Sequence, residues 1–391
     1  MNNMKKPKIR FKGFTDDWEQ RKLEDIVEFL DTLRKPLTEN TRTKGPYPYY
    51  GASGVVDHVA DYLFNEELIL LSEDGANITD RNYPVCFLAS GKYWVNNHAH
   101  VLRAKPKMDN NFICMSLERK DYSNYNTGMA MPKLNQDTCR RIPVDCPSYE
   151  EQKKIGDYFR SLDNLITLHQ RKYEKLQIIK KSMLENCFPK NGEKVPKIRF
   201  SGFTGDWEQR KWCDTVDIST EMVDPTSGEY DDMPHIAPGN IESFTGRILD
   251  NVKSVKEEQL ISGKYRFRPG DVVYGKINPQ LGKYFYASVD GLTSADAYVF
   301  NGKNGVTQKF LFSLLQTEDF FKYSVSVSKR SGMPKINRDE LNAYGFLAPK
   351  EEEQEQIGRF LLEIDKLITL HQSELEKLQK IKKSLLERMF V

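Results

Sequence analysis

The chain has 391 residues, of which 39% are hydrophobic, so it is long enough for two or three domains that each bury a core. Its 58 Lys and Arg residues nearly balance 56 Asp and Glu residues, and the formal charge of +2 excludes a protein that is basic overall, so any nucleic-acid surface must be local. Six cysteines without a C-x-x-C pair argue against a disulfide framework or a zinc knot, and no segment approaches the roughly 18 apolar residues of a membrane span. We therefore expect a cytoplasmic protein that makes no contact with a membrane.

The first recognisable element from the N-terminus is a block that occurs twice. PKIRFKGFTDDWEQRK at residues 7–22 returns as PKIRFSGFTGDWEQRK at residues 196–211, which is 189 residues later. A repeat of this length indicates a duplicated structural unit. We interpret Trp18 and Trp207 in these leading blocks as structural anchors rather than as ligand contacts.

The segments that follow the leading blocks, residues 23–130 and 212–332, share little sequence. Both are rich in Gly, Asn and Tyr. ELILLSED, YPVCFLAS, DVVYGKI, KYFYASV and DAYVF have the composition of strands, whereas NFICMSLE and QKFLFSLLQTEDFFKYS favour helices. Because neither segment has a parallel βαβ rhythm, we expect an α+β protein with two mixed α/β domains and irregular sheets.

A short loop and a long tail then repeat with an offset of 202. MPKLN at residues 131–135 returns as MPKIN at 333–337, and the tail at 151–188 is answered by the tail at 353–390. Because the offset grows from 189 to 202, the second unit carries 13 additional residues in its middle segment.

Both tails are predicted to form long helices. Apolar residues recur in rows at spacings of three and four over five heptads, which is typical of a coiled-coil seam, and each helix should be about 57 Å long. The chain must leave the first helix, build the second domain and return, so we expect antiparallel pairing and a pseudo-two-fold relation between the units. The predicted seam residues are Ile155, Leu162, His169, Leu176, Met183, Ile357, Ile364, His371, Leu378 and Leu385.

His169 and His371 interrupt the two seams at matched positions. Antiparallel pairing should bring the two imidazoles close together. Either each is a lone polar seam residue bonded to water or backbone, or the two rings contact each other and fix the register. A metal role is not favoured, because no carboxylate or thiol recurs beside them at helical spacing.

Several enzyme signatures are absent from the sequence. It has no G-x-x-x-x-G-K-[ST] phosphate loop, no Gly-rich nucleotide turn and no Asn-Pro-Pro-aromatic segment of the kind that amino-methyltransferases use. His98 and His100 alternate as on a strand, which suits a polar face as well as it suits a metal site, and no Ser, His and acid set stands out. We therefore predict a non-catalytic binding protein without a bound metal.

The sequence resembles the specificity (S) subunit of type I restriction-modification systems over essentially its whole length. The resemblance rests on FTDDWEQRKL, on YYGASGVVDHVADYLF with VNNHAHVLR, on the MPKLN and MPKIN loops, and on PSYEEQKKIGDYFRSLDNLI with its partner PKEEEQEQIGRFLLEIDKLI. It implies two target recognition domains at residues 1–147 and 191–348, separated by conserved antiparallel helices at 148–190 and 349–391.

The resemblance also implies a function and partners. The two domains would read a bipartite, asymmetric site on double-stranded DNA, and the helices would set the unread gap. The helices would also dock two DNA adenine methyltransferase subunits, and through them the restriction and translocase subunits. S-adenosylmethionine would be bound by the methyltransferase subunits, so no cofactor is expected in this chain.

Candidate DNA contacts lie in Gly- and Asn-rich loops, where amides and guanidinium groups suit base edges and ammonium groups suit phosphates. The same residue types also make ordinary turns. The candidates in the first unit are Asn77, Arg81, Asn96, Asn97, His98, His100, Lys133 and Asn135. The candidates in the second unit are Lys276, Asn278, Gln280, Lys283, Ser294, Lys329, Arg330, Lys335 and Asn337. The alternative to DNA reading is a non-catalytic coiled-coil scaffold whose variable domains bind protein or glycan.

Overall fold

The computed structural model describes residues 6–190, 192–329 and 332–391. Their packing divides the chain into two compact units: residues 1–168 with 375–391 form unit 1, and residues 169–374 form unit 2. Each unit contains one mixed domain and part of each long helix, which confirms the α+β prediction. The finer division of the chain into four segments stays a prediction, because the packing joins each domain to the helix parts beside it.

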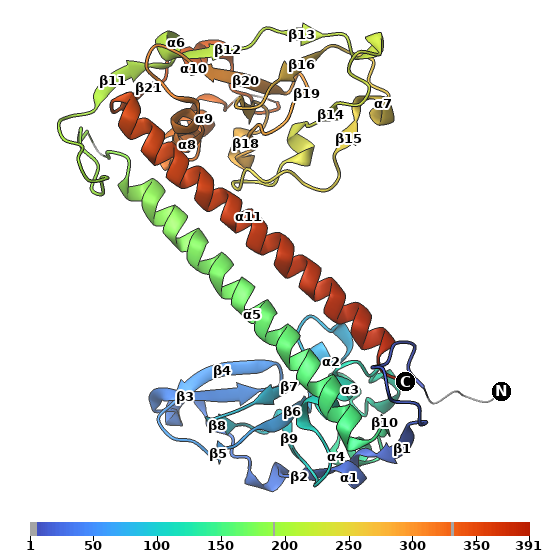
Figure 1. Ribbon diagram of the computed structural model, residues 1–391. Helices are drawn as coiled ribbons and strands as arrows, with labels where there is room; N and C mark the ends of the chain where they lie inside the picture. The colour runs from blue at the N-terminus through green and yellow to red at the C-terminus, as the bar shows by residue number, and fades with distance from the viewer. Residues whose placement is uncertain (1–5, 191, 330–331) are drawn as a thin grey trace. The chain divides into compact units, whose positions relative to one another are not determined.

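Unit 1 contains two four-stranded sheets and a two-stranded ribbon (Figure 1). The sheet β2-β9-β6-β7 is antiparallel throughout, whereas the sheet β4-β3-β8-β5 has one parallel pair, β3 with β8, and the ribbon pairs β1 with β10. The strands are β1 Glu19–Lys22, β2 Val27–Phe29, β3 Lys44–Gly51, β4 Gly54–Val59, β5 Phe64–Asn65, β6 Leu68–Ser72, β7 Cys86–Ala89, β8 Lys92–Val95, β9 Ala99–Ala104 and β10 Pro143–Cys146. The short helices are α1 Leu23–Ile26, α2 Asn77–Asp80, α3 Asn110–Glu118 and α4 Gln136–Arg140, with 3-10 turns η1 Asp31–Leu33, η2 Glu39–Thr41 and η3 Ser123–Tyr125.

Unit 2 repeats this plan, except that its second sheet has five strands (Figure 1). Its sheets have the orders β12-β20-β17-β18 and β13-β16-β19-β14-β15, and the ribbon pairs β11 with β21. The strands are β11 Glu208–Lys211, β12 Val216–Ile218, β13 Met222–Val223, β14 Pro234–His235, β15 Lys253–Ser254, β16 Lys264–Phe267, β17 Val272–Gly275, β18 Tyr284–Tyr286, β19 Gly291–Thr293, β20 Ala297–Gly302 and β21 Gly345–Ala348. The short helices are α6 Trp212–Thr215, α7 Val255–Glu258, α8 Gln308–Leu315, α9 Glu318–Val327 and α10 Arg338–Asn342, with 3-10 turns η4 Pro225–Ser227, η5 Pro238–Asn240 and η6 Pro279–Leu281.

Strand β6 is apolar from Leu68 to Leu71 because both faces of its sheet are covered. On β6, Ile69 and Leu71 enter one core cluster, whereas Leu68 and Leu70 enter another. Successive side chains of a strand point to opposite faces, so a strand buried on both sides loses the polar alternation. The end of β6 is therefore packed on both faces of the sheet.

The predicted tails form helices of 38 residues each, α5 Tyr149–Asn186 and α11 Glu351–Arg388. In unit 1 the start of α5 packs beside the end of α11, and in unit 2 the end of α5 packs beside the start of α11, so the pairing is antiparallel in each unit. Of the ten predicted seam residues, four are buried and six are half-buried. The supercoil itself stays a prediction. Among the residues that the structure describes, no helix is long and apolar enough to cross a membrane.

The predicted approach of the two seam histidines is confirmed within unit 2. Nδ1 of His371 lies 3.2 Å from Nδ1 of His169, and the ring centroids are 5.1 Å apart. At this distance one nitrogen donates and the other accepts, so at most one of the two facing nitrogens carries a proton. That the pair fixes the register of the helices stays a prediction.

The leading blocks mount each domain on the helices of its own unit. Trp18 is buried against Phe112 and Phe390, which confirms its interpretation as an anchor. Ile9 N donates to the carbonyl of Arg388 at 2.9 Å, so the start of the chain is bonded to the end of α11. Unit 2 repeats the contacts with the buried Trp207, which packs against Phe188 and Phe310.

Candidate nucleic-acid interface

The repeated loop of unit 1, residues 131–135, is tied by its main chain to the end of strand β6. Leu134 N donates to the carbonyl of Glu73 at 2.7 Å, and Gly75 N donates to the carbonyl of Pro132 at 3.0 Å. The Leu134 side chain is fully buried beneath the loop. The loop is therefore fixed to the sheet rather than free to move as a surface turn.

The loop of unit 2, residues 333–337, is fixed by the equivalent bonds. Ile336 N donates to the carbonyl of Lys276 at 3.0 Å, and Asn278 N donates to the carbonyl of Pro334 at 2.8 Å. Ile336 is fully buried, as Leu134 is. The two units thus hold this shared loop at equivalent places on equivalent sheets.

The tip of each loop presents a methionine and a lysine. Met131 is 61% exposed and Met333 is 64% exposed, although both are large apolar side chains. Lys133 and Lys335 follow two residues later, and Lys133 lies 3.4 Å from the carboxylate of Glu73. The predicted recurrence of a lysine at this position is therefore combined with an exposed apolar group that sequence reasoning missed.

His100 is buried under the loop of unit 1 and bonded on both sides. Its Nδ1 lies 2.6 Å from Oδ2 of Asp31, and its Nε2 lies 2.7 Å from the carbonyl oxygen of Leu134. Asp31 also accepts hydrogen bonds from Val101 N and from the side chain of Gln136, so its carboxylate is ionised. A carboxylate and a carbonyl both accept, so both ring nitrogens donate and His100 is an imidazolium.

The charges around His100 agree with this protonation state. Burial opposes the charged ring, but the hydrogen bonds to Asp31 and Cys139 raise the pKa of His100 to about 10. Burial likewise opposes the charge of Asp31, and the bond to His100 keeps the pKa of that carboxyl below its usual value. The ring is therefore protonated throughout the physiological range.

Asp31, Glu73 and His100 bring their ligand atoms within 4.8 Å of one another, as a metal site would. The two carboxylates are already neutralised, however. Arg34 lies 2.7 Å from Glu73 and 3.4 Å from Asp31, and Lys133 lies on the other side of Glu73. Because the place of a cation is taken by these side chains, we interpret the cluster as an ion-pair network. Sequence reasoning missed it because its members lie far apart along the chain.

Two of the predicted DNA contacts, His100 and Asn96, are buried in the domain. His100 is only 1% exposed and has no ring nitrogen to offer to a ligand. Asn96 is also buried, and its Oδ1 accepts from the backbone N of His98, so it shapes the turn before β9. Asn97 and His98 in that turn are exposed, and His98 pairs with Asp74 at 2.9 Å. These contacts were predicted from the polar residue type alone, whereas the register of the strand decides which side chains are buried.

The other candidates of unit 1 lie around helix α2. Asn77 closes its loop by donating to the carbonyls of Tyr83 and Pro84, so much of its amide is occupied. Arg81 has a left-handed backbone and its guanidinium bonds to Glu118. These bonds define the loop after β6, and the DNA contacts of both residues stay predictions, as do those of Asn135 and Lys133.

In unit 2 one predicted contact, Lys276, and a second cationic residue, Arg338, lie over one aromatic ring. Nζ of Lys276 lies 5.0 Å from the ring centroid of Tyr298, and the guanidinium of Arg338 lies 5.7 Å from the same centroid. Arg338 also donates to the carbonyls of Ile218 and Ser219 at 3.0 Å, which joins the loop to the start of the domain. Sequence reasoning missed Arg338 because helix α10 carries it outside the predicted loops.

The remaining candidates of unit 2 have varied surroundings. Asn278 is in the left-handed region and accepts from Gln280, Lys283 donates to the carbonyl of Ile241, and Ser294 accepts from a backbone amide. Their DNA contacts stay predictions, together with those of the exposed Lys329, of Lys335 and of Asn337. Arg330 lies outside the described residues.

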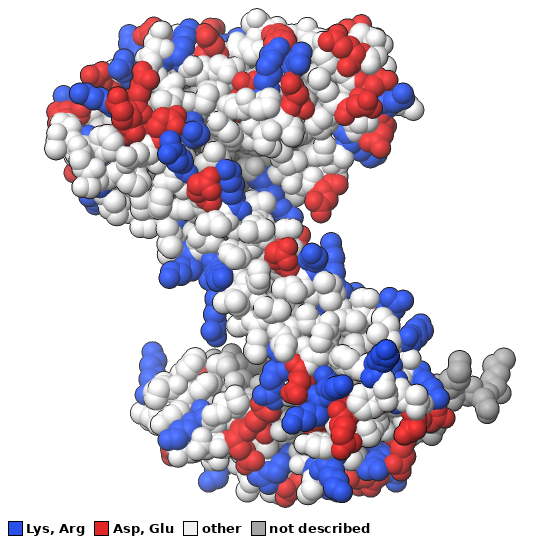
Figure 2. Space-filling model, viewed as in Figure 1, with Lys and Arg blue, Asp and Glu red and all other residues white. Residues whose placement is uncertain are grey.

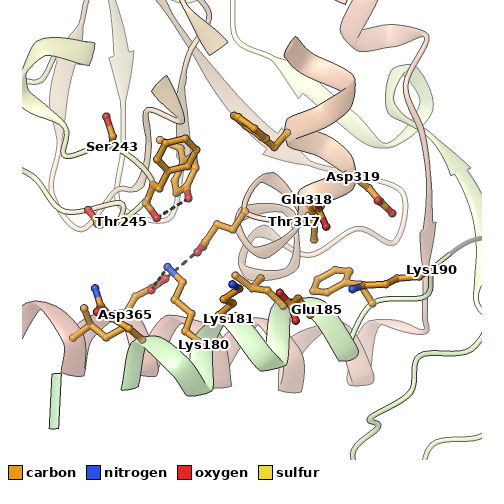
Figure 3. A pocket seen from close by; sticks show the side chains of 18 of the residues that line it. Lys180, Lys181, Glu185, Lys190, Ser243, Thr245, Thr317, Glu318, Asp319 and Asp365 are labelled. Atoms are coloured by element: carbon orange, nitrogen blue, oxygen red, sulfur yellow. Dashed lines mark hydrogen bonds and ion pairs between the residues drawn. The ribbon is translucent and has the colours of Figure 1, made fainter. Parts of the chain in front are cut away.

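A hollow of about 690 Å³ opens in unit 2 between the helices and the domain (Figure 3). Lys180 and Asp365 form a largely buried ion pair at 2.6 Å along its wall, and Gln316 also donates to that carboxylate. Unit 1 has the matching pair, Lys382 with Asp163 at 2.6 Å. These two ion pairs each join α5 to α11. The walls of the hollow carry both signs of charge, which indicates no single class of ligand. Figure 2 shows the same mixture of charges over the face that it draws.

Comparison with known proteins places these features in a family. The family model described as "Type I restriction modification DNA specificity domain" matches the chain twice, at residues 15–177 and 205–380. The EcoDI specificity subunit of a type I restriction enzyme from Escherichia coli is 24% identical over 371 residues, covering 88% of this chain and 80% of that protein. The MjaVIII specificity subunit from Methanocaldococcus jannaschii is 25% identical over 406 residues, covering 95% and 91%.

A solved structure has the same fold. The S subunit of a type I restriction-modification system from M. genitalium superimposes with a TM-score of 0.74 at 11% sequence identity, covering 99% of each chain. The two family matches fall on the two repeated units, and each contains one of the fixed loops. The chain therefore belongs to the type I restriction-modification DNA specificity family, with two copies of the family's domain.

Proposed function

We propose that this chain is the DNA-specificity subunit of a type I restriction-modification complex and that its two units read two different parts of a bipartite DNA site. The observation that carries the proposal is the identically fixed loop in two otherwise divergent domains. A shared loop with a half-exposed lysine suits a phosphate, which is the same at every base pair, whereas divergent loops beside it suit bases.

The residues next to the fixed loops differ in the way that different half-sites require. Glu73 of unit 1 occupies the place of Lys276 in unit 2, since each offers its carbonyl to the loop. One unit thus has a carboxylate where the other has an ammonium group. A carboxylate can accept from a cytosine amino group, whereas an ammonium group donates to guanine, so the two units would prefer different bases.

The long helices offer two equivalent docking faces for modification subunits. In unit 1 the exposed apolar residues Tyr158, Leu165 and Leu168 lie on the outside of α5. In unit 2 the residues Phe360, Leu367 and Leu370 lie on α11 at the same positions of the repeat. Exposed apolar groups in a row mark a protein interface. Two equal faces support two methyltransferase subunits, which would bind S-adenosylmethionine and methylate adenine, while restriction subunits would join through them.

Mapping methylated adenines across the genome, in cells with and without the gene, tests the proposal. We expect a two-part sequence with an unread gap to lose methylation when the gene is deleted. The purified chain should bind a duplex of that sequence with an affinity that falls steeply as salt rises, because each phosphate contact releases counterions. It should transfer no methyl group from S-adenosylmethionine by itself. Unchanged methylation, together with DNA binding that is absent or insensitive to salt, would instead favour a scaffold for protein or glycan.

A further inference from the structure

We propose that His100 and Tyr298 are equivalent positioning residues, each of which holds the fixed loop of its unit against the DNA by a hydrogen bond to one loop carbonyl. The inference rests on the proposed DNA-reading function and adds to it two buried residues that touch no DNA. It assigns them a common task although one is a histidine and the other is a tyrosine.

The two residues occupy the same place in the two sheets. His100 pairs with Leu71 across strands β9 and β6, and Tyr298 pairs with Tyr274 across strands β20 and β17. Each is the second residue of its strand, and each is almost wholly buried. Because strand register sets which face a side chain enters, both point beneath the loop that crosses the strand end.

Both side chains end on the same carbonyl of the loop. Nε2 of His100 donates to Leu134 O at 2.7 Å, and the hydroxyl of Tyr298 donates to Ile336 O at 3.3 Å. Leu134 and Ile336 are equivalent residues of MPKLN and MPKIN. The loop is thus held from above by main-chain bonds to the strand end, and from below by one side-chain donor.

The donors are supported in different ways. In unit 1 the imidazolium is held by Asp31, with Arg34, Glu73, Lys133 and Cys139 as its other polar or charged neighbours. In unit 2 the residue that corresponds to Asp31 is Thr220, because Leu30 N and Ser219 N make the same bond to their strands, to Val101 O and Val299 O. A neutral tyrosine therefore needs no carboxylate.

The consequence concerns the methionine and the lysine of each loop. Lys133 and Met131 are one and three residues from the carbonyl that His100 holds, and Lys335 and Met333 have the same relation to Tyr298. A donor under the carbonyl limits how far these side chains can shift, and a displacement of about 1 Å at a binding group is costly. Loss of the donor should weaken the half-site that its own unit reads and leave the other half-site unchanged.

Variants that differ by one hydroxyl group test the assignment. Tyr298→Phe removes only the donor of unit 2. In unit 1, Asp31→Thr/His100→Tyr imports the neutral arrangement of unit 2, and Asp31→Thr/His100→Phe is its matched control without the hydroxyl. The probes are a duplex with the site obtained from methylation mapping and two duplexes in which one half is scrambled. Full-length chains are compared by binding and by thermal unfolding.

We expect Tyr298→Phe to weaken binding about fivefold on the intact duplex and on the duplex that keeps the half read by unit 2, which is the effect of one neutral hydrogen bond. The duplex that keeps only the other half should be unaffected. The Phe variant of unit 1 should show the mirror-image loss, and the Tyr variant should recover most of it at an equal unfolding temperature.

Binding by Tyr298→Phe that equals wild type on all three duplexes would overturn the proposal, as would equal losses on both halves. This gentle variant decides the matter even where the variants of unit 1 do not fold. A wild-type chain that binds none of the duplexes selectively would instead overturn the proposed function.

Discussion

The pair of Arg10 and Glu151 offers a sharp test of how each domain is mounted on its helices. Nε and one terminal nitrogen of Arg10 each lie 2.7 Å from an oxygen of Glu151, and the Glu151 side chain is 1% exposed. Arg10→Ala leaves this carboxylate buried without its partner, which should cost about 3 to 5 kcal/mol of unfolding free energy. Glu151 lies in the first turn of α5, and the helix dipole recovers about 0.5 kcal/mol of that. We expect a net loss of about 2.5 to 4.5 kcal/mol in unit 1.

Hydrogen exchange followed by mass spectrometry measures the effect in each unit of the full chain. Peptides from residues 7–22 and from the start of α5 should lose protection, whereas peptides from residues 196–211 should not. Arg199→Ala should give the reverse pattern, because Arg199 makes the same two bonds to Glu353 at 2.8 Å.

Two controls show whether the uncompensated charge is the cause. Arg10→Met/Glu151→Met removes both charges and should cost much less than Arg10→Ala, since apolar replacements of a buried pair are often nearly neutral. Arg21→Ala breaks an exposed pair with Glu19 and should cost less than about 1 kcal/mol. The reasoning is refuted if Arg10→Ala costs under about 1 kcal/mol, or if the double Met variant costs as much as the single variant.

Three further outcomes are expected. Burial and the charges of His169 and Lys172 lower the pKa of His371 from its usual 6.5. The unfolded chain therefore binds the proton more readily, and unit 2 should lose stability as the pH falls through about 6.5. His169→Leu/His371→Leu should remove this part of the pH dependence in urea titrations. A circular permutant can join Val391 to the N-terminus and open new ends between residues 190 and 192. It should keep DNA binding, because Ile9 is already bonded to Arg388. Loss of folding in circular dichroism would contradict this. One heptad inserted at matched points of α5 and α11 should lengthen the unread gap in methylation maps, and an unchanged gap would exclude the ruler role.

The sequence was sufficient for the features that repeat or follow a period. The leading blocks, the fixed loops and both long helices were predictable because their signals are local: a copied segment, or apolar residues at helical spacing. The approach of His169 and His371 was also predictable, because both occupy matched heptad positions and the two helices were expected to pair antiparallel.

The order of the strands and the role of His100 could not be predicted in this way. The choice of β9 and β20 as central strands depends on pairs between residues far apart in the chain. His100 has the residue type of a DNA contact, but its register places it under the loop, where Asp31 arrives from a segment 69 residues away. Residue chemistry names the candidates for a site, whereas the register of the sheet decides which of them face the solvent.

Because both loops are held mainly through their main chain, the middle segments should be exchangeable between the two units. Replacing residues 23–130 with a second copy of residues 212–332 brings Tyr298 and Lys276 together, whereas Gln136 stays at the position that Arg338 has in unit 2. Leu134 then offers the carbonyl that Ile336 offers in unit 2. The exchange places a second lysine beside Lys133. Unit 2 already folds with such a pair, because burial first and the charge of Lys335 second lower the pKa of Lys276.

Such a chain should fold and direct methylation to a site made of two copies of the half that unit 2 reads. Glu73→Lys alone should fold less stably than the chimera, because it leaves Arg34 and the His100 imidazolium with one carboxylate fewer. A chimera that folds but still yields the original asymmetric sequence would show that the fixed segments, rather than the exchanged middles, read the bases.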